Sequence, residues 1–412
     1  MLYDKFKNKE DFVEVIYPSM SGYIYFMELE TGEKSRDAIE FGAPIKGTAS
    51  LDPRGYPIIY VGQGVPPSGD TSGNTSDNTY FKAFSLIDGK ELMRFGAVSR
   101  DPFALRKNWQ AYDSSALVDA ESDTLIVLGE NGVMYTCDLN TTYDPATGAV
   151  TMDAEPVKVK YRYTSTRNDA TKRWGMEDSP VAWRNYVIFT DNAGMLQCVD
   201  INTMELVYAN DLTDDSDVSM VLEEDVVNNT FYLYTGCEYD ELVRDSGSSD
   251  TAYARKLDGL TGKVLWDAKF EVVANDSVDG GILASPVLGR EGTSMAGLII
   301  YNVTAEVKGD STTSRLVALD KETGALVWDY DMGVSGWSPS SPVPVYTEDG
   351  QGYIVQCDRA GDVVLIRVDG QTAEEVAKVS MEDNSFEATP AVYGNMIVIA
   401  SKQHNVYFIE IG

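Results

Sequence analysis

An internal repeat is the feature of this sequence that most constrains its fold. Residues 318–328 read ALDKETGALVW and residues 256–266 read KLDGLTGKVLW, so Leu, Asp, Thr, Gly and Trp recur in the same register. Looser copies of the Thr-Gly turn follow at intervals of about 46 to 62 residues, the length of four short strands with their loops. The turn residues are Gly32, Gly89, Gly148, Met204, Gly262, Gly324 and Gly370. The chain is therefore predicted to be built from one repeated β-unit.

Each turn predicts a tight hairpin, and the residue four positions later predicts a packing contact. A hairpin of twisted strands needs a residue that accepts a positive φ, which explains the glycine. We expect a slightly wider turn where Met204 replaces the glycine. The position after the turn is large in most units, with Arg36 as the exception, and we expect it to pack between neighbouring units. Its residues are Met93, Met152, Tyr208, Trp266 and Trp328.

A short segment of small residues, often with proline, opens most units and predicts the innermost strand. Small side chains suit strands that converge on a central channel, and proline suits a strand end that lacks a ladder partner. The segments are Ser114-Ser115-Ala116, Ser179-Pro180-Val181, Ser285-Pro286-Val287, Ser341-Pro342-Val343 and Thr389-Pro390-Ala391, with looser versions at Gly47-Thr48-Ala49 and Ser219-Met220-Val221.

The number of units predicts an all-β chain that folds as an eight-bladed β-propeller of four-stranded antiparallel blades, in a single domain over residues 1–412. Residues 12–32 supply three strands without an innermost one, and residues 387–412 supply three without an outermost one. Six strands exceed one blade, so we expect the first and last blades to be incomplete and natural sequence to precede Met1. The predicted blades are approximately 1–44, 45–108, 109–173, 174–214, 215–278, 279–334, 335–383 and 384–412.

Three polar insertions separate consecutive strands, at residues 66–78, 161–173 and 240–250. They are predicted to be loops within the repeat array, because none of them separates two blocks of patterned sequence. The acidic segment 211–217 lacks the ligand spacing of a calcium-binding loop, and we expect it to be solvated.

Composition narrows the classes of partner. With 65 acidic and 33 basic residues the formal net charge is −32, which disfavours nucleic acid and anionic lipid as partners. No apolar run of about 18 residues predicts a membrane span, and residues 1–6 lack the features of a signal peptide. His404, the only histidine, is expected in a surface loop. Four widely spaced cysteines predict small buried side chains rather than a zinc or redox site: Cys137, Cys198, Cys237 and Cys357.

The pattern Ala-x-Asp-x-x-Thr-Gly-x-x-x-Trp at residues 318–328 resembles the tryptophan-docking motif of the pyrroloquinoline-quinone repeat family. At the level of blades the resemblance covers essentially the whole chain, and two units match closely. The family includes quinoprotein alcohol and glucose dehydrogenases, and also non-enzymatic relatives similar to the lipoprotein of the β-barrel assembly machinery. This chain is closer to the non-enzymatic members, because it lacks the adjacent cysteine pair that many of the dehydrogenases place against the cofactor. The motif packs blades together, so it does not by itself imply a cofactor.

The loops that lead into the innermost strands line one mouth of a propeller, and a candidate ligand site is predicted there. In three of these loops tryptophan precedes the inner-strand serine, and acidic side chains accompany it. Such groups suit a sugar, a cationic peptide or a bound cation; alternatively, the tryptophans plug the channel and pack against one another. The candidate ligand-binding residues are Trp109, Asp113, Trp174, Glu177, Asp178, Trp337, Phe386 and Glu387.

Three functions remain open at this point. The first is a non-catalytic binding or scaffold propeller for a protein or glycan partner, monomeric and, as the resemblance implies, extracytoplasmic. The second is a quinoprotein-type oxidoreductase that uses pyrroloquinoline quinone and calcium, with Trp174, Glu177 and Asp178 as candidates. The third is a carbohydrate-active propeller whose carboxylate pair, such as Glu177 and Glu387, would lie about 5 to 10 Å apart. No recognisable catalytic or metal-binding set is present, which favours the first function.

Overall fold

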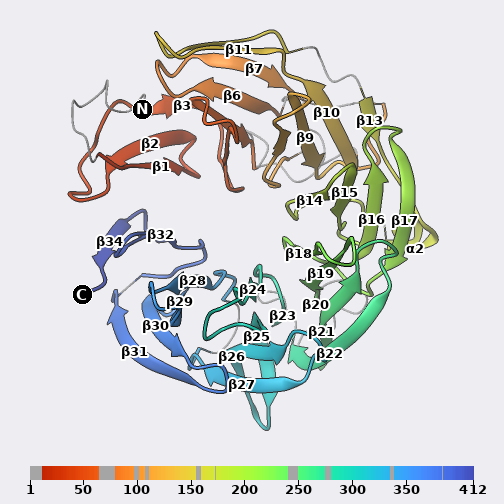
Figure 1. Ribbon diagram of the computed structural model, residues 1–412, viewed down its shortest axis with the longest axis vertical. Coiled ribbons are helices and arrows are strands. Elements are labelled where there is room, and N and C mark those ends of the chain that lie inside the picture. Colours follow the sequence, from red (N-terminus) through yellow and green to blue (C-terminus); the bar gives the residue numbers. More distant parts are fainter. Residues whose placement is uncertain are drawn as a thin grey trace. The chain divides into compact units, whose positions relative to one another are not determined.

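A computed structural model of the chain describes residues 12–64, 79–96, 102–106, 111–154, 159–171, 173–239, 249–273, 280–334, 338–382 and 384–412. Nearly all the regular structure is β-strand, and within these ranges the single helix is the short α2 (Thr166–Thr171) (Figure 1). The predicted all-β class is confirmed. No helix in the described ranges is long and apolar enough to cross a bilayer. The chain divides into two units: residues 1–192 with 199–207 form unit 1, and residues 193–198 with 208–412 form unit 2.

Unit 1 contains three antiparallel sheets in succession, with strand orders β1-β2-β3, β4-β5-β6-β7 and β8-β9-β10-β13, and a separate hairpin β11-β12 (Figure 1). A fourth sheet, β14-β15-β16-β17, contains residues of both units. The bounds are β1 Glu14–Pro18, β2 Tyr23–Glu28, β3 Ile39–Glu40, β4 Ser50–Leu51, β5 Ile58–Gly62, β6 Phe81–Ser85, β7 Glu91–Phe95, β8 Leu117–Asp119, β9 Thr124–Gly129, β10 Val133–Asp138, β11 Thr141–Asp144, β12 Ala149–Met152, β13 Val159–Tyr161, β14 Val181–Trp183, β15 Tyr186–Phe189, β16 Met195–Asp200 and β17 Glu205–Asp211.

Unit 2 continues the pattern. The sets β18-β19-β21-β22 and β24-β25-β26-β27 are joined by one pairing between β22 and β25, and β20 and β23 extend this joint sheet. The sheets β28-β29-β30-β31 and β32-β33-β34 follow. The bounds are β18 Val221–Asp225, β19 Thr230–Gly236, β20 Glu238–Tyr239, β21 Ser249–Asp258, β22 Val264–Val273, β23 Gly280–Gly281, β24 Val287–Leu288, β25 Leu298–Lys308, β26 Ser311–Asp320, β27 Leu326–Asp331, β28 Val343–Tyr346, β29 Gly352–Cys357, β30 Asp362–Val368, β31 Ala373–Ser380, β32 Ala391–Tyr393, β33 Met396–Ala400 and β34 Val406–Glu410.

The core of each unit lies between successive sheets. In β2, Ile24 and Phe26 are buried and Tyr23 is exposed, the alternation expected of a strand that packs on one face. Ile24 and Phe26 share a cluster with Ile59 of β5 and Phe84 of β6, which joins the first sheet to the second. Equivalent clusters join the later sheets within each unit. Burial of these large side chains is the main source of stability for stacked sheets.

The predicted turns are confirmed as left-handed positions. All seven turn residues have a positive φ, between 56° and 74°. Met204 N donates to Asp200 O at 2.7 Å, the same distance as Gly262 N to Asp258 O. The expectation of a wider turn at Met204 is therefore wrong. The Asp200 carboxylate also accepts a hydrogen bond from Asn202 N, and these bonds offset the cost of a left-handed methionine, about 1 to 2 kcal/mol.

One predicted turn, at Gly148, lies in a separate hairpin and not in the four-stranded sheet of its repeat. The Thr147-Gly148 turn joins β11 to β12, which form a sheet of their own, and β13 instead pairs with β10 on the side away from β9. The chain leaves β10 at Asn140, whose φ is 47°, and Thr141 N then donates to the Asp123 carboxylate at 2.6 Å. These two features divert the chain before the turn, which the repeat pattern alone does not reveal.

The large residues after the turns pack between repeats, as predicted. Trp266 Nε1 donates to Lys321 O at 3.1 Å, and Tyr208 Oη donates to Gly259 O at 2.8 Å. Both acceptors stand three residues before the next turn glycine. Arg36 donates through its guanidinium to Leu86 O, which holds the same place before Gly89. Arg36 is thus not an exception, because it makes the contact that tryptophan and tyrosine make elsewhere.

The small inner-strand residues are linked from repeat to repeat. Ser115 N donates to Ser179 Oγ at 3.0 Å in unit 1, and Ser285 N donates to Ser341 Oγ at 3.1 Å in unit 2. Ser341 N in turn donates to Thr389 Oγ1 at 3.3 Å. The hydroxyl is therefore selected by a hydrogen bond as well as by its size.

The remaining expectations are met in part. All four cysteines lie in the described ranges, are buried and form no disulfide, and His404 lies exposed in the β33–β34 turn with a φ of 66°. The insertion 161–173 holds the end of β13 and α2 rather than loop alone. The insertion 66–78 and most of 240–250 lie outside the described residues.

Candidate functional site

The loops that precede the first strand of successive sheets in unit 1 bring charged side chains together. Lys46 precedes β4, Asp113 precedes β8, and Glu177 precedes β14. Glu130 joins them from the turn between β9 and β10. Backbone bonds fix these loops, since Glu130 N donates to Ala111 O at 3.0 Å.

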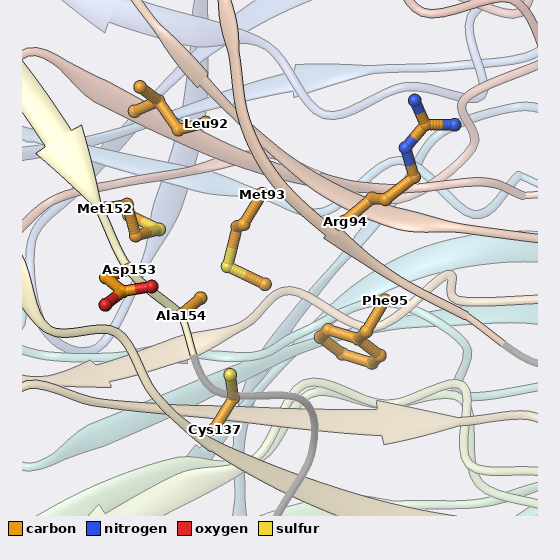
Figure 2. Close-up of a pocket in the computed structure, with 8 residues that line it drawn as sticks. All are labelled: Leu92, Met93, Arg94, Phe95, Cys137, Met152, Asp153 and Ala154. Atoms are coloured by element: carbon orange, nitrogen blue, oxygen red, sulfur yellow. The ribbon is translucent and has the colours of Figure 1, made fainter.

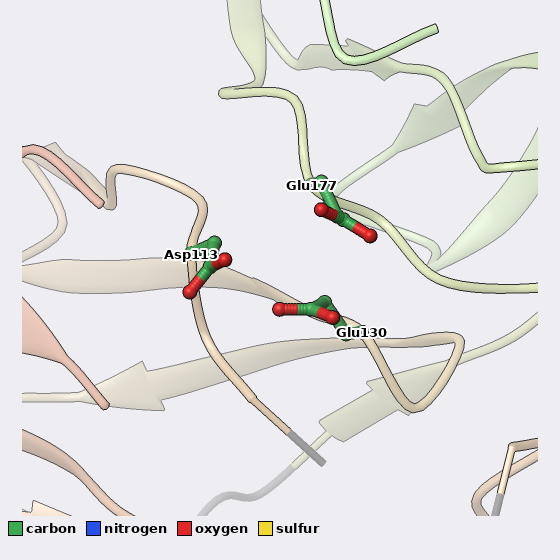
Figure 3. A group of neighbouring side chains, drawn as sticks. All are labelled: Asp113, Glu130 and Glu177. Carbon is green, nitrogen blue, oxygen red and sulfur yellow. The ribbon is translucent and has the colours of Figure 1, made fainter. Parts of the chain in front are cut away.

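Three carboxylates form the centre of this site, and we call Asp113, Glu130 and Glu177 the carboxylate cluster. One oxygen of each lies within 4.8 Å of the others, and Figure 3 shows the carboxylates facing a common space. The side chain of Asp113 is 9% exposed and that of Glu130 is 2% exposed, so solvent screens their mutual repulsion poorly.

Cationic and amide groups of the same unit contact these carboxylates. Lys46 Nζ forms an ion pair with Asp113 Oδ2, and Arg106 lies 3.9 Å from Glu130 Oε2. Asn192 Nδ2 donates to Glu177 Oε1 at 3.2 Å. Each carboxylate of the cluster therefore has a positive or hydrogen-donating neighbour from a different segment.

Burial and the mutual repulsion of the carboxylates shift the pKa values of groups in the cluster. Burial raises the pKa of Asp113 to about 6; Lys46 opposes this shift and Glu177 adds to it. Burial, with repulsion from Glu177 and Asp113, raises the pKa of Glu130 well above its ordinary value, against the opposing charges of Lys46 and Arg106. Burial acts to lower the pKa of Lys46, but the three carboxylates together outweigh it and raise that pKa.

Two glycines allow the loops to approach. A Cβ at Gly47 would overlap the backbone carbonyl oxygen of Asp113, and a Cβ at Gly175 would overlap the side-chain oxygen of Asn192. Any larger residue at either position would push a partner of the cluster away.

The other unit 1 candidates have structural contacts. The Asp178 carboxylate accepts hydrogen bonds from Thr190 N and Thr190 Oγ1, both at 2.9 Å, and is fully buried. Trp174 packs on Gly132, where an added Cβ would lie 2.9 Å from the Cβ of the tryptophan. Of the predicted site residues in this unit, the structure brings together Asp113 and Glu177, whereas Trp109 lies outside the described residues.

In unit 2, Phe386 and Glu387 also have local partners. Phe386 is fully buried and meets the Tyr407 ring edge-on, with centroids 6.0 Å apart. Glu387 accepts a hydrogen bond from Lys402 Nζ at 2.6 Å. Trp337 lies outside the described residues.

Sequence reasoning missed Glu130 and Lys46. A signal for Glu130 exists in the repeat: an acidic residue followed within two or three positions by glycine ends the second strand of several units, as at Glu130-Asn131-Gly132, Asp191-Asn192-Ala193-Gly194 and Asp358-Arg359-Ala360-Gly361. Lys46 has no such signal, because its place at the cluster depends on how the second and third sheets pack.

The acidic segment 211–217 is not the solvated loop that we expected. Asp214, Asp215 and Ser216 are buried. Glu238 N donates to Asp215 O at 3.0 Å, and Ser216 Oγ donates to Gly236 O at 2.8 Å, which draws the segment against β19 and β20. Asp215 and Asp217 then lie near Glu238, with oxygens within 4.8 Å.

The cofactors of the quinoprotein enzymes do not fit the carboxylate cluster. Calcium takes six to eight oxygen ligands, and a cation among them would repel it. Here the Lys46 ammonium sits on Asp113, and Arg106 faces Glu130. The four cysteines are far apart in the sequence and form no disulfide, so no adjacent pair can lie against a quinone. The cation that these carboxylates hold is the side chain of the protein itself.

A cavity of about 170 Å³ lies elsewhere in unit 1, beside the inserted hairpin (Figure 2). Side chains of β7, β10 and β12 line it, among them Met93, Cys137 and Met152, with Arg94 and Asp153 as the charged members. Met93 and Met152 are two of the predicted packing residues, so this cavity is a gap in the packing around the hairpin.

Comparisons with known proteins bear on the fold. No protein-family model matches the sequence, and no curated protein matches it. Among solved structures, BamB from Moraxella catarrhalis is similar over 97% of this chain and 94% of its own, with 16% identity and a TM-score of 0.57. A computationally designed protein, Ika8, matches over 97% of this chain and 93% of its own, with 12% identity and a TM-score of 0.56.

An enzyme is also similar. A quinohemoprotein alcohol dehydrogenase from Pseudomonas putida matches over 93% of this chain and 68% of its own, with 12% identity and a TM-score of 0.56. At these identities the similarity concerns the fold, and it agrees with the repeat type seen in the sequence. The chain therefore has the all-β propeller fold of these solved structures, and its sequence repeat resembles the pyrroloquinoline-quinone type.

Proposed function

We propose that this chain is a non-catalytic scaffold propeller that acts as a monomer and presents its inner loops to a protein partner. We further propose that the chain forms one domain of eight blades, of which the first and the last are incomplete. This arrangement is supported by the three-stranded sheets at the two ends of the chain and by the four-stranded sets between them. The inner loops of such a ring would line one mouth of the channel.

The observation that carries the proposal is that the carboxylates at the inner loops are engaged by groups of the chain itself. A general base or a metal-binding carboxylate must be available to substrate or metal. Asp113 is paired with Lys46, and Asp178 is held by Thr190. These contacts position loops, which is what a binding surface requires.

The charge of the chain supports a protein partner with a basic contact surface. A net charge of −32 attracts cationic surfaces over several ångströms and repels anionic ones. The similarity to BamB, together with the resemblance of the repeats to barrel-assembly lipoproteins, supports a scaffold role and an extracytoplasmic location.

Site-specific photo-crosslinking in the source cells tests the proposal. A photoreactive amino acid at Pro102, exposed in the loop that carries Arg106, is expected to give one discrete protein adduct. The control position is Leu51, which is 56% exposed at the end of β4. The partner, once purified, should bind the chain with an affinity that falls as salt rises. Equal crosslinking at both positions, or none at Pro102, contradicts the proposal.

The quinoprotein oxidoreductase is the second candidate, favoured by the similarity to the Pseudomonas putida enzyme. Titration of the protein with pyrroloquinoline quinone and calcium, followed by absorption spectroscopy, separates the two candidates. The scaffold function predicts an unchanged quinone spectrum, whereas saturable spectral change with alcohol-dependent dye reduction would establish the enzyme.

A further inference from the structure

The carboxylate cluster gathers like charges in a buried part of unit 1. Asp113, Glu130 and Glu177 supply three negative charges when ionised, while Lys46 and Arg106 supply two positive ones. Because Asp113 and Glu130 are buried, repulsion among the three carboxylates is costly, and one proton on a carboxylate would lower it.

The geometry offers a place for that proton. Asp113 uses Oδ2 for Lys46, while its Oδ1 is buried and has no hydrogen-bond donor among the described residues. A proton on Glu130 would turn that carboxyl into a donor for Asp113, and a hydrogen bond from Glu130 is among the influences that lower the pKa of Asp113. Two neighbouring carboxyls that share one proton titrate as a pair.

The members of the cluster come from separate sheets. Lys46 precedes the second sheet, Asp113 and Glu130 belong to the third, and Glu177 precedes the fourth. A change of charge at the cluster therefore acts on the contacts between the inner loops of all three sheets.

We propose that the carboxylate cluster, with Lys46 and Arg106, is a proton-operated clasp: it takes up one proton between neutral and mildly acidic pH and thereby holds the inner loops of three successive sheets together. Within the described part of the chain, these five side chains are the charged groups that act on the shared proton most strongly. The inference goes beyond the scaffold function and does not depend on the identity of a partner.

The sign of the pH effect follows from linkage. The pKa of Asp113 is raised from 3.8 to about 6, and that of Glu130 is also raised, so the folded state holds a proton that the unfolded chain has lost. Stability contributed by the clasp is present in full below the unfolded pKa, near 4, and is lost as the pH rises through about 6. This is the reverse of a carboxylate whose pKa is depressed on folding.

The substitution Glu130→Gln tests the clasp, because glutamine keeps the shape of the protonated carboxyl and balances the charge. Thermal unfolding is measured from pH 5 to pH 8.5 at constant ionic strength. The variant is expected to melt a few degrees above the wild type at pH 8 and at the same temperature at pH 5. Glu121→Gln removes the same charge at an exposed site and controls for the overall negative charge; it should follow the wild type at every pH.

A second variant and a direct readout complete the test. Lys46→Met removes a counter-cation, so the cluster should bind its proton more tightly and the protein should be less stable. We expect this variant to have the lowest melting temperature at pH 8. Infrared difference spectra between pH 8 and pH 5 should show a protonated carboxyl signal that Glu130→Gln removes. Parallel pH profiles of wild type and Glu130→Gln, a Glu130→Gln protein that is less stable at pH 8, or an unchanged carboxyl signal each overturn the proposal.

Discussion

Three different side chains make one contact in this protein. Arg36, Tyr208 and Trp266 each donate to a backbone carbonyl that stands three residues before the next turn glycine. The sequence pattern marks this position as one for large side chains, whereas this contact requires a long side chain with a donor at its end. Arg36 therefore departs from the pattern by residue type and yet makes the same contact.

The two repeats that are most similar in sequence allow the contribution of this hydrogen bond to stability to be measured. Trp266 Nε1 donates to Lys321 O at 3.1 Å, whereas Trp328 Nε1 has no hydrogen-bond partner within the described part of the chain. Both rings are less than 10% exposed, so Trp266→Phe and Trp328→Phe lose similar packing. We expect Trp266→Phe to lower the free energy of unfolding by about 1 kcal/mol more than Trp328→Phe. Denaturant unfolding of both variants checks this, and equal losses would show that the hydrogen bond contributes nothing.

At the scale of elements, the inner strands are held together by hydroxyl groups that reach from one repeat to the one before it. Ser341 Oγ accepts from Ser285 N, and Thr389 Oγ1 accepts from Ser341 N. Short inner strands form few ladder bonds, as with β24, which has two residues, so these side-chain bonds satisfy backbone groups that the ladder leaves over. The sequence showed that small residues recur here, and the structure explains why they are serine and threonine.

The substitution Ser341→Ala tests how much this hydrogen bond contributes to stability. It leaves Ser285 N without its acceptor, and we expect the free energy of unfolding to fall by about 1 kcal/mol. Ser341→Thr should restore stability, since threonine already serves at position 389. Ser311→Ala, at an exposed hairpin position, is the control. Denaturant unfolding decides: an alanine variant as stable as the threonine variant would mean that only side-chain size matters.

At the scale of the whole molecule, charge is the dominant feature. A net charge of −32 on 412 residues sets many like charges against one another in the folded state. Local pairs such as Arg54 with Asp52 at 2.7 Å and Lys321 with Glu291 at 3.0 Å offset only part of this repulsion, because basic residues are half as numerous as acidic ones. The same charge favours a basic partner.

Salt should therefore stabilise this protein. Raising sodium chloride from about 0.01 M to about 0.1 M shortens the Debye length from roughly 30 Å to roughly 10 Å, which screens repulsion between distant charges more than attraction within close pairs. We expect the melting temperature to rise by several degrees, measured by calorimetry at pH 7.5 with potassium chloride as a second salt. A melting temperature that falls with both salts would show that the ion pairs outweigh the repulsion.

The repeat, the all-β class, the left-handed turn positions and the residues that pack between repeats could all be predicted from the sequence. These properties depend on contacts over short sequence separations or on a period that recurs along the chain, so the pattern carries them. The sequence pattern did not predict the diverted turn at Gly148 or the ordinary turn at Met204, because particular hydrogen bonds determine both.

The composition of the candidate site could not be predicted in full from the sequence, because it depends on how the sheets pack. Asp113 and Glu177 were predicted to lie at the inner loops, and the structure brings them together with Glu130 and Lys46. Lys46 is 67 residues from Asp113 in the sequence, and nothing in either local pattern marks them as partners. A charge network of this kind is specified by the packing of three sheets, and its proton equilibria follow from the burial that the packing creates.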